Sequence, residues 1–179
     1  MSEAISVLRH EHDAILMALS ILDRIAEKVR QDDAEPGDVA SFLGFLRDFA
    51  DTCHHGKEEG LLFPAMIAAG LPAESGPVAV MLAEHAEGRD MIAAMRAASE
   101  PTLDSARFSD AAAHYAAHMR QHIDKENAVL FPMAEQIIPA ATLDALASGF
   151  EEHEEKVMGH GRHEELHAML HDLKARYGA

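Results

Sequence analysis

The stretch CHHGKEEGLLFP, residues 53–64, places two adjacent histidines and two adjacent glutamates inside a pattern that predicts a helix. A helix on the surface of a core turns only one side inward, so only one residue of each pair can face the core. Helical steps from His54 and Glu58 reach apolar residues in both directions, whereas steps from His55 reach mostly polar ones. We therefore expect His54 and Glu58 to face the core, and His55 and Glu59 to face water or a helix boundary.

The same pattern occurs twice in the chain. The motif HxxxExxxLFP is present at residues 54–64 and again, without a gap, at residues 122–132. One helical segment earlier, each copy is preceded by a Glu-His pair, which ends at His12 in LRHEH and at His85 in MLAEH. The sequence is therefore a two-fold internal repeat, in which a helix carrying Glu-His is followed by a helix carrying HxxxE.

Composition and breakers predict an all-α fold. The 179 residues suit one domain, the apolar share of 48% excludes a disordered chain, and abundant alanine, leucine, methionine and glutamate favour helix. Proline- and glycine-containing breakers separate six stretches of helical period, near residues 3–31, 38–69, 77–98, 105–137, 142–158 and 162–177. We predict an antiparallel up-down four-helix bundle over residues 1–137 and a C-terminal helical hairpin, residues 138–179, packed on it. Pro64 and Pro132 should each kink a helix or break one turn.

Charge and cysteine content restrict the partners. The formal net charge of -16 argues against binding to nucleic acid or to an anionic membrane. The single cysteine, Cys53, rules out an internal disulfide, suits a reducing compartment and is expected to be a small buried side chain. No apolar signal core and no run of 18 apolar residues occur, so we expect a cytoplasmic protein with no membrane contact.

The chain contains 13 histidines, which is far more than a chain of this size usually has. Four of them lie on the predicted core-facing sides of the bundle helices, together with two glutamates. These six residues are His12, His54, Glu58, His85, His122 and Glu126. Counted from the predicted loops at ~1.5 Å per residue, they lie within about one helical turn of the same depth. Left unpaired in a core, they would cost several kcal/mol, and the two carboxylates would repel each other. A cation removes both costs, and mixed imidazole and carboxylate donors suit iron, manganese or zinc.

Glu-His on the first and third helices, with HxxxE and LFP on the second and fourth, resembles the hemerythrin-like HHE cation-binding domain over residues 1 to about 137. The resemblance implies a four-helix bundle in which these six residues bind a non-haem di-iron centre. Glu58 and Glu126 would bridge two iron ions that an oxo or hydroxo group also joins; manganese and zinc are less favoured. Ligand counting then leaves roughly one open coordination site per iron, where oxygen, nitric oxide or peroxide would bind.

Two positions differ from the oxygen-carrying hemerythrins that the chain resembles. Those proteins have HxxxH on the third helix and an Asp five residues after the fourth-helix His, where this chain has Arg89 and Asn127. The closer resemblance is to members linked to iron sensing, nitric oxide or peroxide chemistry, and repair of damaged iron centres. His118, one turn from His122, and Tyr115 are candidates for an additional ligand or for a side chain that supports one.

The C-terminal hairpin offers weaker signals. His163, His167 and His171 follow one another at four-residue spacing and could hold a metal on the surface, although a leucine seam makes an ordinary amphipathic helix the better interpretation. The segment EEHEE, residues 151–155, is expected to be a solvated helix face.

Three functions remain open at this point. The first is a di-iron protein that responds to or scavenges oxygen, nitric oxide or peroxide, or that takes part in iron homeostasis. The second is a di-iron oxidoreductase, which would need an external electron donor because the chain has no flavin, nicotinamide or haem motif. The third is a metal-free helical interaction module. The predicted partner is a small molecule or a gas, and the sequence identifies no protein partner.

Overall fold

The computed structural model describes residues 1–178, which form helices and short connections with no strand among them; Ala179, the last residue of the predicted extension, lies outside. Eight segments are α-helical: α1 (Glu3–Arg30), α2 (Pro36–Phe45), α3 (Phe63–Ala68), α4 (Gly76–Ser99), α5 (Ser105–Lys125), α6 (Phe131–Ile137), α7 (Ala140–Met158) and α8 (Arg162–Tyr177). Three are π-helical: η1 (Leu46–His55), η2 (Glu58–Leu62) and η3 (Glu126–Leu130). Each predicted helix is present, and its ends differ from the prediction by at most two residues.

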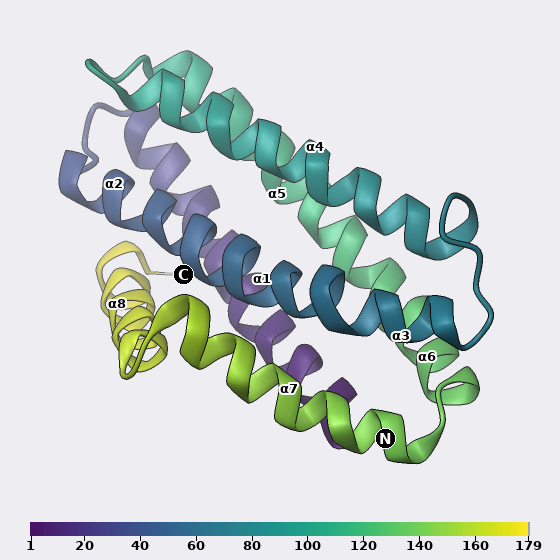
Figure 1. Cartoon of the computed structure of the whole chain (residues 1–179). Helices are drawn as coiled ribbons and strands as arrows, with labels where there is room; N and C mark the ends of the chain where they lie inside the picture. Colours follow the sequence, from purple (N-terminus) through teal and green to yellow (C-terminus); the bar gives the residue numbers. More distant parts are fainter. Residues whose placement is uncertain (179) are drawn as a thin grey trace.

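Four long rods form the bundle, and they run up and down in turn (Figure 1). The rods are α1, the continuous segment α2–η1–η2–α3, α4, and the continuous segment α5–η3–α6. Side-chain caps fix two of the starts, because Ser2 accepts a hydrogen bond from the Ile5 N–H and Asp104 accepts one from the Arg107 N–H. The predicted helical bundle is therefore confirmed.

The π-helical turns η2 and η3 precede the two prolines. In η2 the Phe63 N–H donates to the carbonyl of Glu58, five residues earlier, and Pro64 follows directly. η3 repeats this arrangement before Pro132. In an α-helix the proline ring would clash with the carbonyl four residues earlier, and the wider π turn moves that carbonyl away. The sequence predicted a kink or a break of one turn at each proline, and the structure shows a π-helical turn just before each of them.

A polar layer divides the bundle interior into two apolar clusters. On α1 the residues Ala4, Ile5 and Leu8 belong to one cluster, and the residues from Ala14 onward belong to the other. Glu11 and His12 lie between the clusters and are buried. The apolar side chains above and below the layer keep water from it and leave its polar groups to find partners among themselves.

The two C-terminal helices pack on the bundle. α7 runs along its side against α1, η1 and η2, and α8 turns back against α1 and α2 (Figure 1). The contact is close at the end of η1. Nε2 of His153 donates to the Thr52 carbonyl of η1 at 3.2 Å, and a Cβ atom on Gly56, the residue that follows η1, would lie 2.6 Å from that nitrogen. The leucine seam of α8 is buried, as expected for an amphipathic helix. None of the described helices is long and apolar enough to cross a membrane.

Candidate metal centre

The six predicted residues meet in the polar layer, and the exposed fraction of each side chain is 1% or less. α1 supplies His12, the second rod His54 and Glu58, α4 His85, and the fourth rod His122 and Glu126. Nε2 of His12 lies 3.1 Å from Oε2 of Glu126, and Nε2 of His85 lies 3.4 Å from Oε2 of Glu58. Nε2 of His122 is 3.3 Å from the same Glu126 oxygen. Imidazole nitrogens and carboxylate oxygens thus converge from all four rods on one small space.

His55 also faces this space, and the prediction that it faces water or a helix boundary was wrong. Its side chain is only 3% exposed, and its ring stacks on that of His85 with centroids 3.8 Å apart. The cause is the π-helical geometry of η1, whose i→i+5 hydrogen bonds widen the turn and bring two consecutive residues toward the core. Both His54 and His55 therefore point inward.

In each of the four predicted histidines, Nδ1 contacts an oxygen atom that lies outside the central space. Nδ1 of His54 lies 2.8 Å from Glu11, and Nδ1 of His85 lies 2.8 Å from Glu59. The two other contacts are His12 to Asn127 Oδ1 at 3.1 Å and His122 to Glu84 at 3.0 Å. Each partner atom is an acceptor, so Nδ1 carries the hydrogen of the neutral ring, and Nε2 is the atom that faces the interior and would present its lone pair to a metal ion. Histidines that bind metals are oriented in this way.

The inward atoms lack the hydrogen bonds that buried polar groups normally make. Within residues 1–178, no hydrogen-bond partner is present for Nε2 of His12 or His54, for either ring nitrogen of His55, or for the four carboxylate oxygens of Glu58 and Glu126. Such groups are rare in native proteins, because each costs the desolvation of a polar atom without compensation. The donor set therefore fits metal ions, which would replace the missing partners of nitrogen and oxygen alike.

The pKa values of two inward side chains, Glu126 and His55, favour the protonation states that bind a cation. Burial raises the pKa of Glu126, but its contacts with His12 and His122 outweigh this effect and lower that pKa far below the usual range. Burial, with the neighbouring imidazoles, lowers the pKa of His55 well below its ordinary value. Glu126 is therefore ionised and His55 neutral near pH 7, and these are the protonation states in which both side chains bind metals.

The donors fall into two overlapping groups, each with ligand atoms within 4.8 Å of one another. We call the first the imidazole-rich position; it contains His55, His85, His122 and Glu58. We call the second the carboxylate-rich position; it contains His12, His54, Glu58 and Glu126. Glu58 belongs to both groups, and it lies where a carboxylate could join two cations.

The internal repeat also includes the glutamates and lysines that surround the inward histidines. The sequence prediction missed these glutamates and lysines. Glu11 and Glu84 are the glutamates of the two Glu-His pairs, and each holds the histidine of the HxxxE motif that follows it. Each also pairs with the lysine that precedes the inward glutamate of that motif, Lys57 in the first half and Lys125 in the second. The aligned motifs contain this signal as HxxKE, preceded by Glu-His.

A third cluster of possible ligands, Glu11, Glu154 and His163, lies outside the centre. The ammonium of Lys57 already contacts both glutamates, at 2.7 Å from Oε2 of Glu154. An internal cation thus occupies the place that a metal ion would need. The prediction that residues 151–155 form a solvated face was wrong at His153 and Glu154, which face the bundle.

The remaining candidates lie around the centre. His118 directs Nε2 to the Glu84 carbonyl oxygen at 2.9 Å and belongs to neither donor group. Tyr115 is buried, and its hydroxyl has no hydrogen-bond partner in the described chain. Arg89 donates to Asp51 at 2.7 Å and to Glu59 at 2.6 Å, so it binds the carboxylate that holds His85.

The fold and the site define a helical bundle with a buried cluster of histidines and glutamates that could hold metal ions. The model of the hemerythrin HHE cation-binding domain family matches residues 3–134. The chain belongs to this family, and its metal-binding character agrees with the buried donors. No curated protein and no solved structure matches the chain. Helices α7 and α8 lie beyond the matched segment.

Proposed function

We propose that the protein binds two iron ions in the polar layer and responds to or scavenges oxygen, nitric oxide or peroxide, or takes part in iron homeostasis. One observation carries the metal binding. Among the described residues, Nε2 of His12 and His54, both ring nitrogens of His55 and the carboxylate oxygens of the two inward glutamates have no hydrogen-bond partner, while outside acceptors fix Nδ1 of His12 and His54. A metal-free interaction module would leave that desolvation cost without compensation.

The ligand assignment follows the two donor groups. His12, His54, His85 and His122 would each bind through Nε2. Glu58, which belongs to both groups, would bridge the two positions. We propose the same role for Glu126, which belongs to the carboxylate-rich position and whose Oε2 lies 3.3 Å from Nε2 of His122 in the other. His55 is the addition to the set expected from the sequence, and it would bind in the imidazole-rich position. The mixture of imidazole and carboxylate favours iron over magnesium or calcium, with manganese and zinc as alternatives.

Bound iron would supply one-electron redox chemistry and open coordination positions for a small molecule. The chain contributes the rest: the outer acceptors hold the rings in one orientation, and the apolar clusters exclude water from the layer. Arg89 of α4 binds Glu59, the carboxylate that contacts Nδ1 of His85. The ligand would be a gas or a molecule of similar size, because the interior is packed with side chains on every side.

Elemental analysis tests the proposal. Protein produced in cells supplied with iron should hold about two metal ions per chain, mainly iron, as the donor count requires. A metal content near zero after such loading would refute the proposed function, and a pure zinc pair would redirect it to hydrolytic chemistry. Mixing the anaerobic iron-loaded protein with oxygen, nitric oxide or peroxide, and measuring turnover with an added electron donor, then separates a sensor or scavenger from an oxidoreductase.

A further inference from the structure

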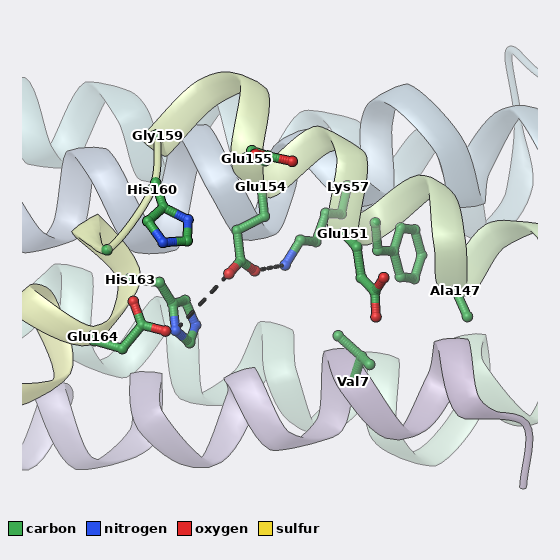
Figure 2. Close-up of a pocket in the computed structure, with 12 residues that line it drawn as sticks. Val7, Lys57, Ala147, Glu151, Glu154, Glu155, Gly159, His160, His163 and Glu164 are labelled. Atoms are coloured by element: carbon green, nitrogen blue, oxygen red, sulfur yellow. Dashed lines mark hydrogen bonds and ion pairs between the residues drawn. The ribbon is translucent and has the colours of Figure 1, made fainter.

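Lys57 is a buried lysine between two helices that lie far apart in the sequence. Its side chain is 1% exposed, and its ammonium contacts Glu11 of α1 and Glu154 of α7, the latter at 2.7 Å. Figure 2 shows Lys57 and Glu154 meeting at the wall of a pocket of about 560 Å³, with His163 on the other side of Glu154. A buried ammonium is costly unless carboxylates neutralise it, so both contacts matter to its position.

Lys57 is linked to the proposed metal centre through Glu11. One carboxylate oxygen of Glu11 contacts Lys57, and the other lies 2.8 Å from Nδ1 of His54. The same carboxylate therefore neutralises the lysine and orients an inward histidine. Burial opposes ionisation of Glu11, but the contacts with His54 and Lys57 hold its pKa at about 2.

The second half of the repeat lacks this connection. Lys125 corresponds to Lys57, but its side chain is 46% exposed, and within residues 1–178 its only ion pair is with Glu84. Neither α7 nor α8 supplies a second carboxylate there. The two halves of the centre thus differ because α7 covers one of them.

We propose that Glu154 is a positioning residue for the metal centre, so that α7, which lies beyond the family's matched segment, completes the surroundings of His54. The inference rests on the proposed metal binding. With Glu154 neutralised, Glu11 would be the only carboxylate that neutralises Lys57. The Glu11 carboxylate would then accept a weaker hydrogen bond from Nδ1 of His54, and this bond is the one that orients Nε2 of His54 inward. The change would also remove one negative charge near the cation positions, and both effects reduce metal affinity.

The comparison of Glu154→Gln with Glu155→Gln tests this. Both side chains line the same pocket and both changes remove one negative charge, so long-range electrostatics are matched. Co²⁺ is titrated into the metal-free full-length protein, and its d–d spectrum reports the ligands. Outer partners of metal ligands are typically worth about 10–100-fold in affinity. Glu154 acts one residue further out, so Glu154→Gln should lose roughly threefold to tenfold and alter the spectrum, while Glu155→Gln stays within about twofold of wild type.

A double variant shows whether Glu154 acts through the lysine. In a Lys57→Met background, Glu154→Gln should cause no further loss of Co²⁺ affinity, because the group through which it acts is gone. Losses that add would overturn the inference, since Glu154 would then act by another route. A Lys57→Met protein that fails to fold leaves the decision to the two single variants.

The outcomes separate this inference from the proposed function. Wild-type protein that binds no Co²⁺ overturns both. Wild-type protein that binds Co²⁺, with Glu154→Gln and Glu155→Gln equal in affinity and spectrum, overturns the positioning role alone. A spectrum that changes only in Glu154→Gln supports that role, because a general loss of stability would not alter the ligands of the metal that stays bound.

Discussion

The Nε2 atoms of His85 and His122 lie 3.1 Å apart, although Nδ1 of each ring contacts a carboxylate outside the centre. With both Nδ1 atoms protonated, two lone pairs would face each other unless a proton or a metal ion lies between them. Burial lowers the pKa of His85, but contacts with Glu58 and Glu59 outweigh burial and raise it to about 9. The metal-free protein therefore keeps a proton where the proposed centre would hold a cation.

Metal binding should release protons. At pH 7 the His85 ring is protonated in the metal-free protein, and the pKa of His12 is also raised, since Glu126 outweighs the effect of burial. Metal ions displace these protons, so we expect release of about one to two per chain. Titration with Co²⁺ in weakly buffered indicator dye measures the release, and the part of it that comes from His85 should fall as the pH rises through about 9. No proton release at pH 7 would contradict the protonation of His85.

The stability of the metal-free protein should fall as the pH rises from about 7 to 10. The folded pKa of His85, about 9, lies above the ordinary value of 6.5, so its contribution is complete below pH 6.5 and is lost as the pH rises through 9. Urea unfolding at several pH values measures this. Glu59→Gln should reduce the pH dependence, because it removes one contact that raises the pKa, whereas the exposed Glu87→Gln should leave it unchanged.

The helices could be predicted because their ends and seams are local properties. Breakers marked the loops, and apolar spacing placed His12 and His85 inward without knowledge of the partner helices. His55 could not be placed, because counting at 3.6 residues per turn assumes an α-helix and η1 is π-helical. The widening depends on packing among several rods, which the sequence of one segment does not contain.

His55→Ala should lower the metal content from about two ions per chain to about one, because the imidazole-rich position loses one of its four donors. His10→Ala is the matched control, since His10 is exposed on α1 and belongs to neither donor group. Metal analysis after gel filtration gives the result. A His55→Ala protein that keeps both ions would show that this ring only packs against His85.

The charged residues that surround the inward histidines could not be predicted, for a different reason. Glu11 and Lys57 are charged residues at positions that one helix alone would leave exposed, and they are buried where α7 packs against α1, η1 and η2. Their spacing in the repeat was visible, but repeated charges also arise on solvated faces. The structure distinguishes the two cases by the contacts that each charge makes.

Glu84→Gln should weaken metal binding by about 10–100-fold, the usual effect of removing the partner that orients a ligand histidine. The amide can accept from Nδ1 of His122 but carries no charge to strengthen that bond or to balance Lys125. Competition with a chelator measures the affinity. Glu87→Gln, on the same helix and 63% exposed, is the control. Equal affinity of the two variants would show that the Glu84 contact does not support the centre.

Gly56→Ala should detach part of α7 from the bundle, while Gly60→Ala should not. A Cβ atom at residue 56 would lie 2.6 Å from Nε2 of His153, so that ring must move and lose its hydrogen bond to the Thr52 carbonyl, at a cost of about 1 kcal/mol. A Cβ atom at residue 60 meets nothing within 4 Å among the described residues, and the gain in helix propensity, up to about 1 kcal/mol, is kept. Because both positions are helical, the gain in propensity is common to the two variants, and Gly56→Ala should be less stable than Gly60→Ala by about 1 kcal/mol in urea unfolding. Hydrogen exchange should rise in α7 only in Gly56→Ala, because His153 is the contact that the new methyl group displaces. Equal stability and equal exchange in the two variants would mean that α7 adapts to the methyl group and that this close approach does not hold the helix in place.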